Sequence, residues 1–543
     1  MNKVIRRLVS FMCALTLVQR TSSDVMMSSM KIERMVKNEE SLLQQLKTFI
    51  DDQLDRIKIM AQFFADRWLE IHMDNSTTQT ELDHPNAIFH VIKHFSEKYG
   101  TALGNKLDIF LHFAKRPKDI VVSDEEDIFV SDEEDIFVSD EEDIHTASLA
   151  LIRLQKLYNL SVSDMINGDY LGFKGPFLTS LDAFEIGLHA LEDKDINKSL
   201  EWLHASLTKQ SDGTYSQWKG EEKLDIATVK AIIGHTYLYF GKVEEAESLD
   251  NETKMLNTNH SLVLRVKNAL RKTETEEDGA ELEERSRYYD NYTKLCRLQS
   301  QFYEEPPNDV RLVCRYRETL LPYYRFQEEL LSISPFVSLI YKFTTDTESE
   351  FFKTAVRNKL ERGRTFKGKH RGVVSKGRTG HIAWVDNEDS EIANQVAEKI
   401  TQVTGFNASR IDYSADAYQV VNYGLAGHYY VHLDAKEDIF ERIMTFLIYL
   451  SDVEMGGATI FPKVGISVSP QKNMALLWYN YSPAHELDIL TEHAGCPVLK
   501  GQKWILTKWI LPGKSNIFRR RCGLKPNSTQ LDIEDNMRRK YRT

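Results

Sequence analysis

The chain has 543 residues, of which 42% are hydrophobic and 28% are charged, a composition typical of folded globular proteins. Its length exceeds what one hydrophobic core supports, so several domains are expected. The chain carries 81 acidic and 69 basic side chains, a formal net charge of -12. This balance disfavours a nucleic-acid partner, because phosphate binding requires a basic surface.

Residues 1–22 are typical of a secretory signal peptide. Lys3, Arg6 and Arg7 precede an apolar stretch over residues 8–18, which is too short to span a bilayer. The start of an amphipathic helix is the alternative interpretation. Because no later stretch reaches 18 uncharged apolar residues, we expect a mature chain of the secretory pathway without a membrane span.

Residues 23–115 are predicted to be helical. Between Ser41 and Trp68, apolar residues recur at steps of three and four, which places them on one stripe of a helix. A second helix is expected around residues 87–99. The stripe indicates a dimerisation region, or equally a helix that packs within its own domain.

An acidic repeat occupies the predicted linker 116–144. The pentapeptide SDEED occurs three times, beginning at Ser123, Ser131 and Ser139. With four acids in every eight residues, the segment is expected to be solvated and extended.

Residues 145–275 are predicted to be helical and to resemble tetratricopeptide repeats. Small and large residues occur at the spacing of such a helix pair at Ile233, Gly234, Tyr237, Gly241 and Ala246. Stacked pairs form a concave surface that suits an extended peptide. A plain helical spacer is the alternative.

Four cysteines remain once the signal peptide, which contains Cys13, is set aside. An even number in a secretory chain favours two disulfides. Of the three possible connectivities, the simplest is the sequential one, Cys296–Cys314 within a linker 276–331 and Cys496–Cys522. Nine N-x-[ST] sequons further predict a glycoprotein.

Residues 332–522 are predicted to form a β-rich domain, followed by a tail over 523–543. Short runs rich in β-branched and aromatic residues alternate with turn residues, which is typical of a double-stranded β-helix, or jelly roll. These runs are AYQVVNYG, TFLIYLSDV, ATIFP, ISVSP, MALLWYN and KWILTKWIL. The expected fold is therefore multidomain α+β, with helical domains before a C-terminal jelly roll.

Three residues of this domain are candidate metal ligands. His432 and Asp434 are two positions apart, so a strand would point both to the same face. An HxD triplet alone is common by chance, but His493 follows 59 residues later, beyond four predicted strands. Two imidazoles and one carboxylate form the facial triad of non-haem iron(II) oxygenases. Lys503 lies ten residues further on and could pair inside the barrel with the distal carboxylate of 2-oxoglutarate; a solvated strand lysine is the alternative.

The chain resembles the α subunits of endoplasmic-reticulum collagen prolyl 4-hydroxylases. The resemblance runs through NYGLAGHYYVHLD, RIMTFLIYLSDVEMGGATIFPKVGISVSP, LLWYN and EHAGCPVLKGQKWILTKW, and continues weakly over nearly the whole mature chain. It implies a procollagen-proline 4-dioxygenase in which the triad binds Fe(2+) and Lys503 binds the C5 carboxylate of 2-oxoglutarate. Tyr423 and Thr459 resemble further co-substrate contacts, and L-ascorbate is the implied reductant.

The resemblance also implies partners and a compartment. It assigns peptide binding to the tetratricopeptide-like region, dimerisation to the N-terminal helices, and the same sequential disulfide pairing. It further implies a protein disulfide isomerase β subunit in an α2β2 tetramer of the endoplasmic-reticulum lumen.

Two departures leave the substrate open. The segment between Asp434 and Arg442 is shorter than in collagen-type members, and the tyrosines of GHTYLYF are placed differently. The substrate could be a collagen-like or proline-rich chain, or a non-collagen chain acted on by a related dioxygenase. A non-catalytic scaffold that binds proline-rich peptides is the third interpretation.

Overall fold

The computed structural model forms two units, residues 1–78 and 79–543. The described residues are 47, 84–96, 141–209, 226–239, 290–298, 309–319, 321–367, 370–374, 377–410, 413–435, 442–482, 486–512 and 516. The predicted signal peptide, the helical stripe over 41–68 except Lys47, the first two acidic repeats and Cys522 lie outside them.

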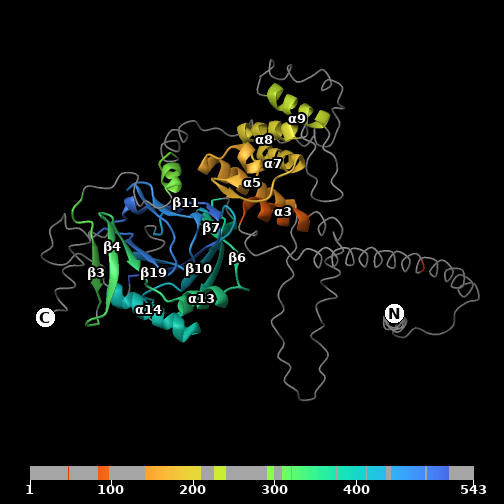
Figure 1. Cartoon of the computed structure of the whole chain (residues 1–543). Coiled ribbons are helices and arrows are strands. Elements are labelled where there is room, and N and C mark those ends of the chain that lie inside the picture. Colours follow the sequence, from red (N-terminus) through yellow and green to blue (C-terminus); the bar gives the residue numbers. More distant parts are fainter. Residues whose placement is uncertain are drawn as a thin grey trace, which may run out of the picture. The chain divides into compact units, whose positions relative to one another are not determined.

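The helical part of the second unit consists of short helices with a small hairpin. The elements are α3 (Pro85–Phe95), α5 (Glu141–Tyr158), α6 (Val162–Ile166), β1 (Asp169–Tyr170), β2 (Phe173–Lys174), α7 (Ser180–Glu192), α8 (Ile196–Lys209) and α9 (Ile226–Tyr239) (Figure 1). A capping box starts α7, because Thr179 and Asp182 each accept a hydrogen bond from the other's backbone N–H. None of the described helices is long and apolar enough to cross a membrane.

The packing of α7 on α8 depends on Gly187. A Cβ built there would lie 2.9 Å from Cγ of Leu203, so a larger residue would push the helices apart. Ser199 Oγ, on α8, donates a hydrogen bond of 2.7 Å to the carbonyl of Gly187. This close approach is the one expected of an antiparallel helix pair. Assignment of the region to the tetratricopeptide class stays a prediction.

The C-terminal part is built on a nine-stranded antiparallel sheet and a smaller four-stranded sheet. The large sheet has the order β3-β4-β5-β16-β12-β19-β10-β9-β6. Its strands are β3 (Cys314–Glu318), β4 (Arg325–Ile333), β5 (Phe336–Tyr341), β6 (Glu361–Arg362), β9 (His381–Val385), β10 (Tyr418–Tyr423), β12 (Met444–Tyr449), β16 (Ala475–Tyr479) and β19 (Lys503–Ile510).

The small sheet has the order β11-β17-β14-β15. Its strands are β11 (Tyr429–His432), β14 (Thr459–Phe461), β15 (Ile466–Val468) and β17 (His493–Gly495). Two further pairs are β7 (Arg364–Lys367) with β8 (His370–Val374) and β13 (Met455–Gly456) with β18 (Val498–Lys500). Apolar side chains of both main sheets form one shared core, the two-layer arrangement expected of a jelly roll.

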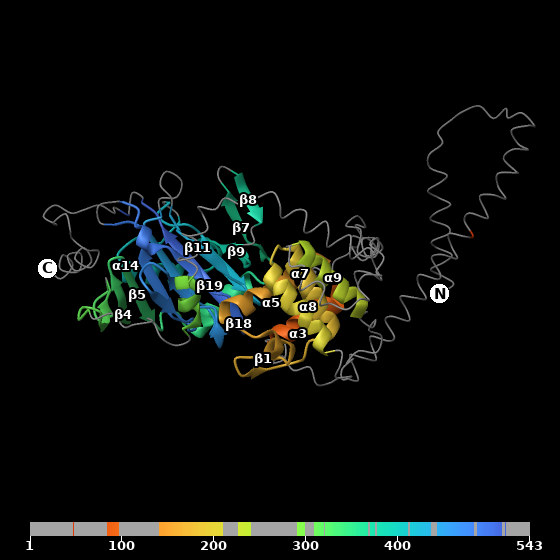
Figure 2. The same ribbon diagram turned by 90° about the horizontal axis from the view of Figure 1, so that it is seen from above.

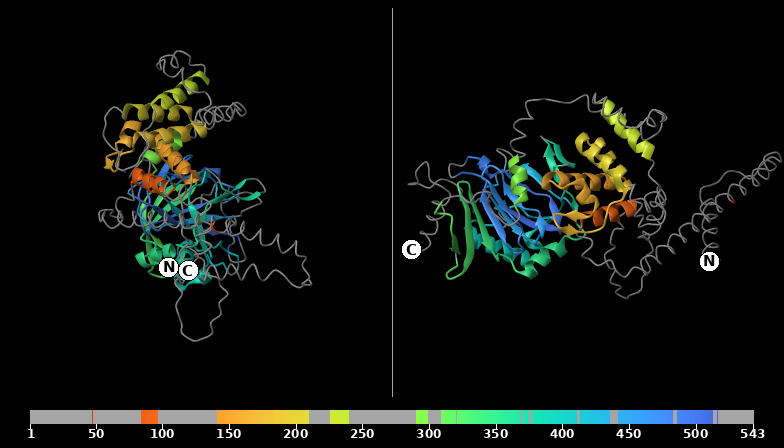
Figure 3. Two further views of the ribbon diagram at one scale, coloured as in Figure 1. Left: turned by 90° about the vertical axis from the view of Figure 1, so that its right-hand side faces the viewer. Right: turned by 45° about the horizontal axis from the view of Figure 1, so that its top comes forward.

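Both faces of the large sheet are covered, which explains why its central strands are continuously apolar. On β12, Met444, Phe446 and Ile448 belong to one core, and Leu447 and Tyr449 to the other. The first core is closed by α13 (Asp346–Ala355) and α14 (Glu391–Thr404), two helices on the outer face of the sheet (Figures 1 and 3). The second core faces the small sheet and the predicted site.

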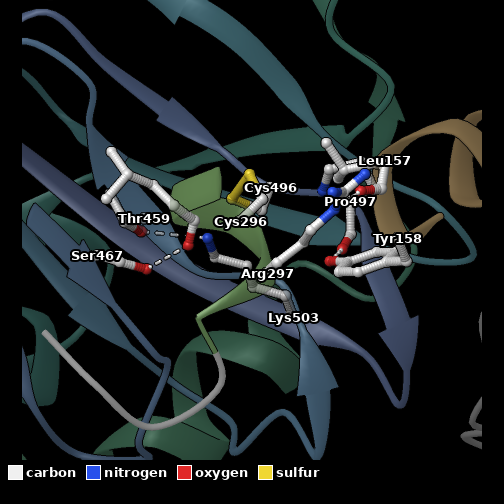
Figure 4. The surroundings of a disulfide bond; sticks show 10 residues. Leu157, Tyr158, Cys296, Arg297, Thr459, Ser467, Cys496, Pro497 and Lys503 are labelled. Atoms are coloured by element: carbon white, nitrogen blue, oxygen red, sulfur yellow. Dashed lines mark hydrogen bonds between the residues drawn. A yellow bond between two sulfur atoms is a disulfide. The ribbon is translucent and has the colours of Figure 1, made fainter. Parts of the chain in front are cut away.

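The outer face of the small sheet is covered by the helical part. Ala458, Ile460 and Ala494 share a core with α5. Tyr158 Oη donates a hydrogen bond of 2.6 Å to the carbonyl of Pro497, and Arg297 Nε donates one of 2.6 Å to the carbonyl of Leu157 (Figure 4). The sheet that carries two predicted metal ligands is thus held from behind by α5.

The predicted sequential disulfide pairing is wrong. Cys296 bonds to Cys496, 200 residues away (Figure 4). Cys314 is exposed at the start of β3 and has no disulfide partner among the described residues. Residues 290–297 form a helical segment that packs on the small sheet, where Ser467 Oγ donates to the carbonyl of Leu295 at 2.9 Å. This packing brings Cys296 to Cys496, whereas Cys314 belongs to the far edge of the large sheet.

The predicted strands are otherwise confirmed as β10, β12, β14, β15, β16 and β19. The large sheet also includes β3 and β4, which begin before residue 332, where we expected the domain to start. At the predicted boundary between the acidic linker and the tetratricopeptide-like region, α5 already begins at Glu141. The end of the third acidic repeat is therefore helical rather than extended. The remaining domain boundaries stay predictions.

Candidate metal and co-substrate site

The three predicted ligands meet between the two sheets. One ligand atom from each of His432, Asp434 and His493 lies within 4.8 Å of the others. Both imidazoles present Nε2 to the carboxylate, at 3.7 Å from Oδ1 for His432 and from Oδ2 for His493. His432 pairs directly with His493 across β11 and β17. The separation of 59 residues along the chain is closed by this strand pairing.

Each imidazole is oriented by a backbone carbonyl. Nδ1 of His432 lies 2.7 Å from the oxygen of Tyr430, and Nδ1 of His493 lies 3.0 Å from the oxygen of Thr491. When Nδ1–H donates to these carbonyls, Nε2 keeps its lone pair for a cation. Burial lowers the pKa of His432 to about 3, so its ring is neutral at physiological pH.

Asp434 lies just beyond the end of β11, not within the strand as we expected. Its position is set by Thr445 on β12, whose Oγ1 donates a hydrogen bond of 2.7 Å to Oδ2. Burial would raise the pKa of this carboxyl group, but His493, His432 and Arg442 outweigh it and lower the pKa to about 2. The group is therefore ionised at neutral pH.

Lys503 lies on β19 and points into the same cavity. The ammonium is buried, and the described residues provide Thr459 Oγ1 as its hydrogen-bond partner at 3.2 Å but no carboxylate. Burial lowers its pKa to about 7. A buried cation without an anion is costly, and a ligand carboxylate would satisfy it.

Tyr423 and Thr459, the two further co-substrate contacts that the resemblance implies, also lie around Lys503. The rings of Tyr423 and Tyr449 are each centred 5.8 Å from its Nζ. Tyr449 Oη donates a hydrogen bond of 2.9 Å to Thr459 Oγ1, which fixes the hydroxyl that faces the lysine. Burial raises the pKa of Tyr423, so its phenol stays protonated.

Two of these residues were missed by sequence reasoning. Thr445 and Tyr449 lie four positions apart on β12, on the same face as Leu447, which lines the cavity. The available signal was that the two residues with a hydroxyl group in the run TFLIY share one face of the strand. The indole of Trp478 also lines the cavity, 4.6 Å from the ring of His493.

The residues present fit an iron(II) ion and 2-oxoglutarate. The donor set is two imidazoles and one carboxylate, the set that non-haem iron(II) oxygenases use. The buried cation in the same cavity has no carboxylate partner among the described residues, so it is available to the distal carboxylate of a dicarboxylic co-substrate. Fold and site together define an iron(II)- and 2-oxoglutarate-dependent oxygenase.

Comparison with known proteins agrees with this class. Residues 418–511 match the 2OG-Fe(II) oxygenase superfamily, and residues 28–172 match the prolyl 4-hydroxylase alpha-subunit N-terminal region. Prolyl 4-hydroxylase subunit alpha-2 of Gallus gallus is 32% identical over 69% of this chain and 74% of its own length. Subunit alpha-1 of the same organism is 28% identical over 93% of this chain and 96% of its own length. The chain belongs to the family of prolyl 4-hydroxylase α subunits.

Among solved structures, the viral collagen prolyl hydroxylase vCPH from Paramecium Bursaria Chlorella virus-1 aligns with 32% of this chain and 94% of its own. The sequence identity is 24% and the TM-score is 0.27, which is too low to support a conclusion.

Proposed function

We propose that this chain hydroxylates C4 of proline in collagen-like or other proline-rich secreted chains, with O2 and 2-oxoglutarate as co-substrates. The observation that carries the proposal is the buried ammonium of Lys503, which has no carboxylate partner among the described residues and shares its cavity with the triad. Membership in the prolyl 4-hydroxylase α subunit family supports proline as the target.

In this proposal His432, Asp434 and His493 hold iron(II), and Lys503 binds the C5 carboxylate of 2-oxoglutarate. When bound, the ion and the co-substrate supply the oxidant that converts a C–H bond to C–OH and releases succinate and CO2. The chain orients the two imidazoles through the carbonyls of Tyr430 and Thr491, orients the carboxylate through Thr445, and excludes water with the apolar walls of the cavity. L-ascorbate would return oxidised iron to its ferrous state.

The helical part would deliver the peptide. On α8 and α9, His204 Nε2 lies 2.9 Å from Tyr237 Oη, which gives this pair of helices an aromatic and polar face. We infer that the tetratricopeptide-like region binds proline-rich segments and that the N-terminal helices mediate dimerisation. A protein disulfide isomerase β subunit, glycosylation and residence in the endoplasmic-reticulum lumen complete the proposal.

The test is turnover by the full chain, coexpressed with a protein disulfide isomerase, on (Pro-Pro-Gly)n peptides with iron and ascorbate. We expect succinate and hydroxyproline in equal amounts, and neither from a His493→Ala variant. Succinate without hydroxyproline would refute the collagen-like substrate and leave a related dioxygenase. Absence of both products would favour a non-catalytic scaffold.

A further inference from the structure

The segment that joins β6 to β9 is strongly basic. Residues 362–378 contain seven Lys or Arg residues and no Asp or Glu, in a chain whose net charge is -12. Most of the segment forms the β7–β8 hairpin, paired from Arg364–Val374 to Lys367–His370 (Figure 2). Such a concentration of one sign is unusual in an acidic chain and calls for an anionic counterpart.

The C-terminal end of this segment lies along the strand that carries a metal ligand. Arg378 forms an isolated β-bridge with Tyr429, at the start of β11. The N–H of Tyr430 donates to the carbonyl of Gly377 at 2.9 Å, and the N–H of Thr379 donates to the carbonyl of His428 at 3.0 Å. Residues 377–379 therefore lie beside β11, and Arg378 itself lines the cavity.

Two arginines lie near Arg378, one from the start of the segment and one from α5. Arg362 lies where the segment begins, and Arg153 of α5 donates a hydrogen bond of 3.2 Å to the carbonyl of Ala426. Burial, followed by the positive charge of Arg153, lowers the pKa of His428 to about 2. This imidazole is therefore neutral and adds no charge of its own.

The positive charge around Arg378 exceeds the negative charge. Arg153, Arg362 and Arg378 are each half-buried, and in the part of the chain that the structure describes none forms an ion pair with a carboxylate. Asp143 is the acidic neighbour of Arg362, and Asp193 a more distant one of Arg153. Buried Nε of Arg378 also lacks a hydrogen-bond partner among the described residues.

We propose that Arg153, Arg362 and Arg378 form a carboxylate-binding rim that selects peptides with Asp or Glu close to the target proline. The inference rests on the proposed hydroxylation and narrows its substrate class. A guanidinium binds a carboxylate through two parallel hydrogen bonds. A cationic cleft also attracts anionic chains over a distance, an effect that salt screens.

Binding is measured first, with the full chain and two fluorescent proline-rich peptides that differ by Glu or Gln beside the proline. In 50 mM salt the Glu peptide should bind about fivefold more tightly for each carboxylate engaged. The ratio should fall towards one in 0.5 M salt. Equal affinities of the two peptides at low salt would overturn the proposal.

Variants then show which arginines cause the preference for the Glu peptide. Arg362→Gln should bring the Glu/Gln affinity ratio closer to one and leave the affinity for the Gln peptide unchanged. The matched control is Arg325→Gln, which removes the same charge from exposed β4, near the opposite edge of the large sheet. The variant Arg153→Gln removes another guanidinium of the rim and decides the question if Arg362→Gln does not fold. A ratio that both variants leave at the parental value would refute the rim.

Hydroxyproline formation in the same samples separates this inference from the proposal on which it rests. If neither peptide is hydroxylated, the hydroxylase proposal fails, and the binding ratio alone reports on the rim. If both peptides are bound and hydroxylated equally well, the acidic preference is wrong and the hydroxylase stands.

Discussion

Replacement of Lys503 by methionine should change co-substrate affinity and stability in opposite directions. Among the described residues, the buried ammonium has Thr459 as its hydrogen-bond partner and no anion. Burial lowers its pKa from 10.5 to about 7. That shift corresponds to on the order of 5 kcal/mol against the charged form in the folded protein. Methionine has a similar length and carries no charge, so it removes this cost.

The expected size of each effect follows from these contacts. After subtraction of about 1 kcal/mol for the lost hydrogen bond, K503M should raise the free energy of unfolding by roughly 2–4 kcal/mol at pH 7. In contrast, a carboxylate of 2-oxoglutarate left unpaired in the cavity should cost roughly 3–5 kcal/mol of binding. The dissociation constant would then increase by a factor of about 100 to several thousand.

Denaturant unfolding and calorimetric titration with manganese(II) in place of iron measure the two effects. Lys508→Met is the matched control, since Lys508 is also buried with a pKa lowered to about 7 but packs over Tyr418 in the other core. K508M should leave the affinity for 2-oxoglutarate at the parental value. A K503M variant that is less stable than the parent and binds 2-oxoglutarate equally well would refute the reasoning.

Three further outcomes are expected. Thr445→Val should weaken metal binding about 10- to 100-fold, because it removes the hydrogen bond that orients Asp434; equilibrium dialysis measures this, and Thr445→Ser should retain the parental affinity. With the pKa of Lys503 at about 7 in the free protein, binding of 2-oxoglutarate should take up a proton above pH 7, and affinity should fall by up to about tenfold per pH unit. Titration in buffers of different ionisation enthalpy detects that uptake, and an affinity that is constant from pH 7 to 9 would contradict it. Cys296→Ser should lower the free energy of unfolding by about 2–5 kcal/mol, because it opens a 200-residue loop; a peptide map of the parent without a Cys296–Cys496 link would rule this out.

The chemistry of the site could be predicted from the sequence because it depends on residue types at short spacing. The two-residue spacing of His432 and Asp434 was enough to predict that they act together, although Asp434 lies beyond the end of β11 and not within the strand. The apolar run around Lys503 was enough to predict that it lies inside the domain. The strands β12 and β19 were predictable for the same reason, since both faces of the large sheet are covered and the runs are apolar throughout.

The tertiary structure decided which residues distant in sequence contact one another. His493 reaches His432 through the pairing of β11 with β17, and Thr445 reaches Asp434 from a third strand. Cys296 meets Cys496 because residues 290–297 pack on the small sheet, although Cys314 is much closer along the chain. Local patterns encode which face a side chain takes, whereas the strand or helix that it meets is set by the burial of whole faces against one another.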